Sequence, residues 1–365
     1  TDDIFNITQK QKLSTLSEEI VLKSKPGTNW QWTTGVFGFY QWLNTDGPVL
    51  FKEEGVKEMI EENVNKIFAG LPEGAPVMNL AVNNNNLITT GNFDTPNLNL
   101  AIYHQSTYEN LFVEGLSFTA GLRLDYEKNS MKYNSGSSNL NYDFTLTSPM
   151  IPRPITLPIE TTGPNFMGKE TNDYLQLLPK FALKYDIDSR NNIYASVSKG
   201  YRSGGYNVQM FSDIIQSELS SSMIKDVKTN LKEYMLNVPG MTEPAVDGML
   251  SMIPDRENEF SISNSTVYKP EYSWNYEVGA HLTLFDNRLF ADLAAFYMDT
   301  HDQQIARFSD NGFGRMTENA GTSRSYGVEA ALRSQITNAL MLNLNYGYTH
   351  ATFRKYESNH KLNGK

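Results

Sequence analysis

The sequence predicts an all-β fold: an antiparallel, up-and-down transmembrane β-barrel, of which this chain supplies about ten strands, with long and partly helical extracellular loops. Several segments of about 10–16 residues alternate apolar and polar side chains, as a strand between two different environments must. No window approaches about 18 consecutive apolar residues, which excludes a transmembrane helix. The mean hydropathy of −0.45 is compatible with a barrel, because the apolar and polar residues of an alternating strand offset each other in the mean.

The segment 191–207, NNIYASVSKGYRSGGYN, shows the alternation clearly. Its apolar side chains are predicted to face lipid: Ile193, Ala195 and Val197. The alternate side chains are predicted to face a wet interior: Tyr194, Ser196 and Ser198. Segments 116–127, 273–284, 325–333 and 340–351 divide in the same way, whereas the strands around Val36 and Phe296 carry aromatic residues on both faces.

Connections between these segments alternate in length. Short turns are expected near residues 26–27, 110–115, 186–192, 286–287 and 337–339. Long excursions are expected at 43–97, 128–173, 203–270 and 301–322. Short turns at one end and long loops at the other are typical of an up-and-down barrel standing in a membrane. A soluble sandwich has no reason to sort its connections in this way.

Two of the long loops contain helical patterns. In 53–70, apolar residues recur at helical spacing from Val56 to Phe68, and Gly70 is a candidate cap. In 203–270, a long helix is predicted over roughly 211–237, and a short one begins at Thr242 with Pro244 in its first turn. These helices either pack the loops against one another or form part of a binding surface or lid.

Residues at the exit of the 191–207 strand are the candidate ligand-binding residues: Tyr201, Arg202 and Tyr206. Tyr201 is also predicted to stand in an aromatic girdle at the membrane interface, together with Tyr126, Tyr346 and Tyr348. Arg202 and the following glycines mark the entry into the 203–270 loop. Rim arginines and girdle tyrosines also occur without any ligand, so both interpretations stay open.

Composition excludes several classes of function. A net charge of −10 and a pI near 5.1 argue against a nucleic-acid partner. The absence of cysteine removes disulfides, thiolate metal sites and cysteine nucleophiles. The five histidines lack ligand spacing, and no catalytic or phosphate-binding motif is present, so neither an enzyme nor a cofactor is expected. Inward-facing charges are expected to pair across neighbouring strands or with a segment that fills the interior of the barrel: Arg123, Asp125, Glu277, Glu329 and Arg333.

Several motifs resemble the barrel of TonB-dependent outer-membrane receptors. They are LLPKFALKYDIDSRNNIYASVSKGYRSGGYN (177–207), YKPEYSWNYEVGAHLTLFDNRLFADLAAFYMD (268–299) and NAGTSRSYGVEAALR (319–333). The resemblance extends over roughly residues 98–355. It implies a large plugged barrel in the outer membrane of a Gram-negative bacterium. Such a receptor imports a scarce nutrient (siderophore-bound iron, haem, cobalamin or a glycan) with energy from TonB.

The sequence also departs from that family. Neither a plug nor the N-terminal segment that engages TonB is visible, and the chain ends at HKLNGK without a terminal aromatic strand. We therefore interpret residues 1–365 as a middle portion of a receptor barrel. The alternatives are a non-transporting, β-rich carbohydrate-binding or adhesion module, and an outer-membrane barrel enzyme, which the missing catalytic triad disfavours. No motif in the loops identifies a substrate.

Overall fold

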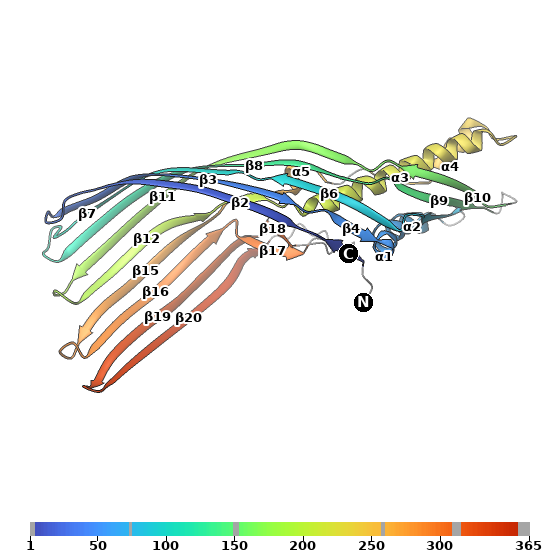
Figure 1. Cartoon of the computed structure of the whole chain (residues 1–365). Coiled ribbons are helices and arrows are strands. Elements are labelled where there is room, and N and C mark those ends of the chain that lie inside the picture. The colour runs from blue at the N-terminus through green and yellow to red at the C-terminus, as the bar shows by residue number, and fades with distance from the viewer. Residues whose placement is uncertain (1–3, 73–74, 149–152, 257–259, 309–314, 357–365) are drawn as a thin grey trace.

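Ten long antiparallel strands form one curved sheet in the computed structural model, which describes residues 4–72, 75–148, 153–256, 260–308 and 315–356 (Figure 1). Their order in the sheet follows their order in the chain, which confirms the up-and-down prediction. They are β2 (Lys10–Lys23), β3 (Trp30–Asp46), β7 (Asn97–Tyr108), β8 (Leu116–Ser137), β11 (Asn165–Asp186), β12 (Asn192–Arg202), β15 (Glu271–Leu284), β16 (Leu289–His301), β19 (Gly321–Thr337) and β20 (Leu340–Tyr356). Within the described residues no pairing joins β2 to β20, so the sheet is open.

Short turns gather at one end of this sheet and long connections at the other (Figure 1). The turns between consecutive long strands span residues 24–29, 109–115, 187–191, 285–288 and 338–339. Gly27 and Gly115 adopt φ angles of +95° and +85° in two of them, a conformation that glycine enters without strain. The long connections span 47–96, 138–164, 203–270 and 302–320. The predicted sorting of connections is therefore confirmed.

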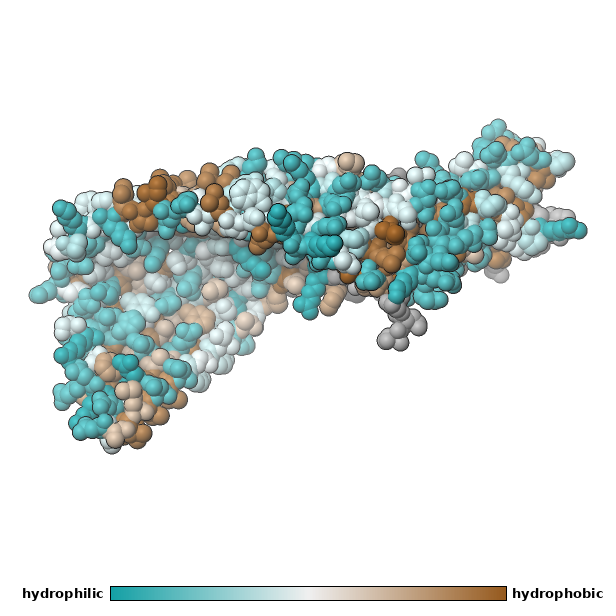
Figure 2. Space-filling view, in the orientation of Figure 1, coloured by the Kyte–Doolittle hydropathy of each residue, from teal (hydrophilic) through white to brown (hydrophobic). Residues whose placement is uncertain are grey.

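The two faces of the sheet differ in polarity, as the alternation of apolar and polar residues in the sequence predicts. Hydrogen-bonded register places these residues in one row: Phe118, Leu183, Ala195, Val278, Ala295 and Val328. The neighbouring row on the opposite face contains Ala182, Ser196, Glu277, Phe296 and Gly327. The hollow of the sheet is coloured mostly hydrophilic or neutral in Figure 2, and strongly hydrophobic residues appear along its upper rim. The convex face is therefore the apolar one.

Two predicted loop boundaries are wrong. Residues 128–173 were expected to form a loop, yet β8 and β11 stay paired from Lys128↔Asp173 to Gly136↔Asn165. This part of both strands lies beyond the stretch whose outer face is apolar. Polar side chains occupy both of its faces, so the alternation disappears. The connection proper is 138–164, and it contains β9 (Leu140–Thr147) and β10 (Ile155–Thr161).

The other long excursions also contain strands. Within 43–97, β4 (Val49–Lys52) and β6 (Asn86–Asp94) extend the main sheet together with β1 (Phe5–Ile7), while β5 (Val77–Val82) pairs with β9. Within 301–322, β17 (Gln304–Phe308) and β18 (Arg315–Asn319) form a hairpin. Within 203–270, β13 (Gly205–Tyr206) pairs with β14 (Val267–Tyr268).

The predicted helices are present. The first runs through α1 (Glu53–Val56), a π-helical turn η1 (Lys57–Glu61) and α2 (Glu62–Ala69), and Gly70 follows it at φ −83°, outside the left-handed region. The others are α3 (Met210–Leu236), α4 (Glu243–Leu250), with Thr242 before it, and α5 (Ile262–Ser265). No helix within the described ranges combines the length and the apolar character needed to cross a membrane.

Three long connections share one hydrophobic core. Val56, Ile60, Val64 and Phe68, the stripe predicted for the first helix, pack with the three-stranded sheet β10–β9–β5 and with α3 and α4. The residues that α3 contributes to this core are Leu219, Met223, Ile224, Val227, Leu231 and Met235. We call residues 47–96, 138–164 and 203–256 the loop unit. It confirms that the helices pack the loops together.

Candidate functional site

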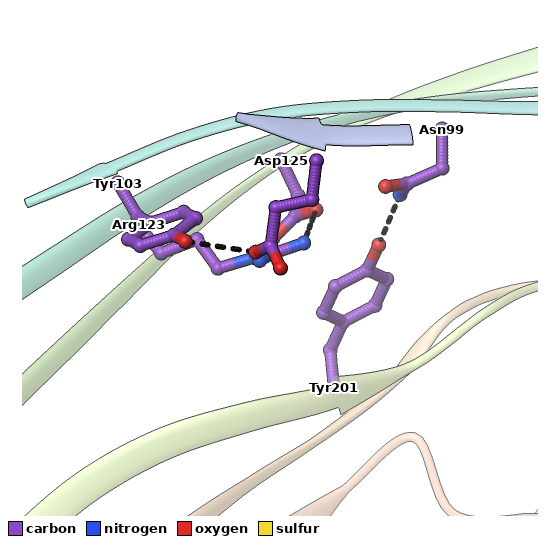
Figure 3. Close-up of polar contacts among 6 residues, drawn as sticks. Asn99, Tyr103, Arg123, Asp125 and Tyr201 are labelled. Atoms are coloured by element: carbon purple, nitrogen blue, oxygen red, sulfur yellow. Dashed lines mark hydrogen bonds and ion pairs between the residues drawn. The ribbon is translucent and has the colours of Figure 1, made fainter. Parts of the chain in front are cut away.

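The sheet divides at the end of β12, where the predicted ligand-binding residues begin. Pairing between β11 and β12 stops at Lys180↔Ser198, whereas pairing between β12 and β15 continues to Arg202↔Glu271. β11 meanwhile stays paired with β8 as far as Asn165. The last residues of β12 thus separate from β11, and Tyr201 turns toward the concave face of β7 and β8 (Figure 3).

A polar side chain on β7 holds Tyr201 there. Asn99 Nδ2 donates a hydrogen bond of 2.8 Å to the Tyr201 hydroxyl. The two residues are 102 positions apart in the sequence. The prediction that Tyr201 stands in an outer aromatic girdle is therefore wrong, because its polar end lies inside the sheet. Tyr346 and Tyr348 do lie on the apolar face, in the rows of Ala330 and Val328.

Arg123 on β8 is fixed beside this contact. Its Nε and Nη2 donate to the two carboxylate oxygens of Asp125 at 2.6 and 2.9 Å, a bidentate arrangement. Its guanidinium also lies over the rings of Phe37 and Tyr103, 5.4 and 5.7 Å from their centroids. Pairing across strands was expected for these charges. Arg123 and Asp125 pair along one strand instead, because residues i and i+2 share a face.

A buried carboxylate follows two positions along the same face. Glu127 has no exposed surface. Its Oε1 accepts hydrogen bonds from Asn97 Nδ2 at 3.0 Å and from Asn129 Nδ2 at 2.9 Å. Its Oε2 has no hydrogen-bond partner within the described part of the chain. The carboxylate is thus held by neutral amides rather than by a cation.

The start of the 203–270 loop docks onto this network. Asn129 Nδ2 donates to the carbonyl of Gly204 at 3.2 Å. The Tyr206 hydroxyl accepts from Asn172 Nδ2 at 2.9 Å and donates to the Asn129 carbonyl at 3.3 Å. Burial raises the pKa of Tyr206 to about 12, so its phenol keeps the proton that it donates even in moderately alkaline solution. Further along, Phe211 packs on Phe93 and Tyr133, with ring centroids 5.0 and 4.9 Å apart.

Arg202 differs from the two tyrosines. Its side chain is exposed, on the outer end of β12 opposite Glu271. The structure thus brings Tyr201 and Tyr206 into one concave network and leaves Arg202 at its rim. Sequence reasoning missed the asparagines that receive the tyrosines: Asn99, Asn129 and Asn172. Asn99 had a signal, its place on the polar face of an alternating strand, whereas Asn129 and Asn172 lie where the alternation has disappeared and had none.

A second polar patch lies on the concave face among β12, β15, β16 and β19. The Tyr194 hydroxyl donates to Glu277 Oε1 at 2.7 Å, and His281 Nδ1 lies 2.6 Å from Asp292 Oδ1. These four residues and Glu329 line a shallow recess of about 510 Å³. The described residues contain no group of three or more histidine, cysteine or acidic side chains able to hold a metal ion.

Both patches offer hydrogen-bond donors and acceptors on a rigid strand scaffold. Arg123 and His281 are engaged by carboxylates, and the tyrosines are engaged by amides or a carboxylate. None of these contacts pairs a base with a serine or threonine nucleophile. The arrangement is suited to binding a polar solute or a protein segment inside the sheet, and to anchoring a loop.

Comparison with known proteins gives a family and a fold. A family model described as "TonB dependent receptor-like, beta-barrel" matches residues 24–365. The ferric yersiniabactin uptake receptor FyuA from Yersinia pestis is similar in structure at 16% identity, over 96% of this chain and 37% of its own, with a TM-score of 0.53. This chain therefore spans 37% of the length of FyuA.

Two further solved structures resemble the chain less closely. The alcaligin outer-membrane receptor FauA from Bordetella pertussis matches 94% of this chain and 54% of its own, at 10% identity and a TM-score of 0.30. The siderophore receptor PirA from Pseudomonas aeruginosa matches 97% and 61%, at 9% identity and a TM-score of 0.33.

Proposed function

Since the chain belongs to the TonB-dependent receptor β-barrel family of non-enzymatic outer-membrane transporters of Gram-negative bacteria, we propose that it forms part of the wall and the extracellular surface of a receptor that imports a scarce nutrient. The convex face of the sheet contacts outer-membrane lipid, and TonB is the partner that supplies the energy for import.

This proposal is supported by the arrangement of three regions along the direction of the strands. Short turns close one end, ten strands with one apolar face follow, and a folded loop unit stands at the other end (Figure 1). The loop is anchored to the inside of the strands at Gly204 and Tyr206. A wall that presents an apolar outside, a polar inside and a structured outer mouth suits the capture and passage of a polar solute.

The cargo remains within the classes that such receptors carry: siderophore-bound iron, haem, cobalamin or a glycan. FyuA takes up ferric yersiniabactin, so a ferric chelate is among the candidates. Tyr201, Arg202 and Tyr206 are the proposed contacts at the mouth. Arg202 is the best placed of the three to meet an anionic cargo, because its side chain is exposed while both phenols already have partners.

We expect Arg202→Ala to weaken cargo binding by the intact receptor about tenfold, since a hydrogen bond to a charged group contributes roughly 1.5–3 kcal/mol. The measurement is binding and uptake by cells that carry the variant. Arg190→Ala is the matched control, because Arg190 is exposed in the turn 187–191 at the opposite end of the sheet. Unchanged affinity in Arg202→Ala would remove this residue from the site.

We expect Tyr206→Phe to loosen the start of the loop without unfolding the barrel. The change removes the hydroxyl that bonds Asn172 and the Asn129 carbonyl, at about 1 kcal/mol for each hydrogen bond. Hydrogen exchange should therefore rise in residues 203–211 and stay constant in β15 and β16. Equal exchange in both proteins would show that this hydroxyl does not anchor the loop.

A further inference from the structure

The charged residues of the convex face begin directly beyond its tyrosines. Hydrogen-bonded register defines one row of this face as Val197, Tyr276, Tyr297, Tyr326 and His350. The next row of the same face, toward the long connections, is Lys199, Trp274, Asp299, Arg324 and Thr352. Tyrosines on the outside of a barrel mark the level at which hydrocarbon gives way to lipid headgroups. The second row therefore lies at the level of the headgroups, on the side of the long connections.

Two arginines meet at this second row. Arg324 on β19 is exposed, and its Nε donates to Thr352 Oγ1 on β20 at 3.4 Å. Arg354 stands two residues after Thr352 on β20, and its side chain reaches toward β16, where Nη2 donates to the Tyr297 hydroxyl at 3.0 Å. In the sheet β19 lies between β16 and β20. Both guanidinium groups are thus held on the outer face of the same three strands.

A single carboxylate offsets only part of the charge of this pair. Asp299 Oδ1 lies 3.5 Å from Arg354 Nη1, yet it has no hydrogen-bond partner among the residues that the structure describes. Asp299 Oδ2 lies 3.2 Å from His301 Nε2, so the histidine shares the same carboxylate. Arg324 forms no ion pair within the described part of the chain. Two guanidinium groups beside one carboxylate leave an excess of positive charge.

An apolar groove begins at the tyrosine row. It has a volume of about 610 Å³, and Tyr276 and Tyr297 line its end nearest the arginines. From there it follows the apolar rows toward the short turns, along Val197, Val278 and Ala295. The groove exists because small side chains on these strands lie between larger ones. A charged pair and an apolar groove thus adjoin on the face that meets lipid.

The combination selects the occupant. Anionic groups at the surface of a membrane are mainly lipid phosphates, and basic clusters at headgroup level attract them. A guanidinium binds phosphate through parallel N–H donors, and the two terminal nitrogens of Arg324 are free for this contact within the described structure. Water can solvate these donors, but it supplies neither the negative charge nor an apolar chain for the groove.

We infer that Arg324 and Arg354 bind a phosphate group of a lipid in the outward-facing leaflet of the membrane. An acyl chain of the same lipid occupies the groove below the tyrosines. Asp299 competes with the phosphate for Arg354, which keeps the site selective for a strongly anionic headgroup. The inference goes beyond the proposed function, because it concerns a lipid that binds the outside of the wall and not the cargo.

Three matched probes test this inference by competition with a fluorescent lipid A on the purified intact receptor in non-ionic detergent. They are unlabelled lipid A, lipid A without its phosphate groups, and inorganic phosphate. Lipid A is expected to bind at least about tenfold more tightly than the dephosphorylated lipid, which corresponds to about 1.4 kcal/mol. Inorganic phosphate at the same concentration should displace nothing, because it lacks the chain that fills the groove. Equal binding of both lipids, or displacement by inorganic phosphate, would overturn the inference.

Two variants locate the phosphate. Arg324→Gln should weaken the binding of lipid A about tenfold and leave the affinity for the dephosphorylated lipid unchanged. Asp299→Asn should strengthen the binding of lipid A, because it removes the carboxylate that competes for Arg354. A merely structural role of Asp299 predicts weaker binding instead.

Arg333→Gln is the matched control. Arg333 is an exposed arginine of the same strand, but it lies on the concave face, with its guanidinium 4.8 Å from the centroid of the Phe290 ring. Its substitution should leave the affinity for lipid A unchanged. Equal losses in Arg324→Gln and Arg333→Gln, or weaker binding in Asp299→Asn, would contradict the site. A receptor that imports its cargo but does not distinguish the two lipids would overturn this inference and leave the proposed function intact.

Discussion

Phe144→Ala is expected to destabilise the loop unit by about 3–5 kcal/mol, the usual range for removing a buried phenylalanine. Phe144 has no exposed surface, and its ring meets Phe68 edge-on at a centroid distance of 5.9 Å. It lies on β9, the central strand of the sheet β10–β9–β5. Loss of this side chain leaves a cavity where three long connections meet, so all three should loosen together.

Limited proteolysis and hydrogen exchange of the intact receptor measure this effect. Exchange should rise in α2, β9 and α3 of Phe144→Ala and remain unchanged in β15, β16 and β19. Thr145→Ala is the matched control, because Thr145 is the next residue and points to the more exposed face. Loosening of 138–164 alone would contradict a core shared by the three connections.

Leu344→Arg is expected to lower the stability of the folded barrel, by up to about 2–4 kcal/mol, because it places a charged side chain on the face that meets hydrocarbon. Leu344 lies opposite Leu332, which in turn lies opposite Ala291, in a row of the apolar face. Denaturant unfolding of the intact receptor in lipid vesicles gives the free energy directly.

Asn345→Arg is the control for this substitution. Asn345 is one residue along β20, so it belongs to the concave face, and it borders the recess that contains Glu277, Asp292 and Glu329. An arginine there meets water and carboxylates, and the stability should stay close to that of the native protein. Equal destabilisation by the two substitutions would show that the faces of β20 are assigned wrongly.

Sequence alone predicted the part of the fold that the membrane constrains. Where one face of a strand meets hydrocarbon, apolar and polar residues alternate along the sequence. This alternation reveals both where the strand lies and which way each side chain points, as at Ile193 to Ser198. Beyond the apolar band the rule fails. Residues 128–136 of β8 are paired strand, yet polar side chains occupy both faces, so no periodicity marks them.

The site was predicted less completely, because its residues are distant in the sequence and only the folded strands bring them together. Tyr201 follows the outward alternation of its strand, but the separation of β12 from β11 after Ser198 turns it inward to Asn99.

The most direct test of a membrane-spanning wall is a single label at one chosen position, in a receptor whose cysteines outside residues 1–365 are replaced by serine, since residues 1–365 themselves contain no cysteine. Ala195→Cys and Ser196→Cys place a fluorophore on the two faces of β12, one residue apart, in the intact receptor in lipid vesicles. A quencher attached to the lipid chains should quench the probe at 195 strongly and the probe at 196 weakly, and a water-soluble quencher should reverse that order. Equal quenching at both positions, or a preference of the lipid quencher for 196, would contradict a barrel wall whose apolar face meets lipid.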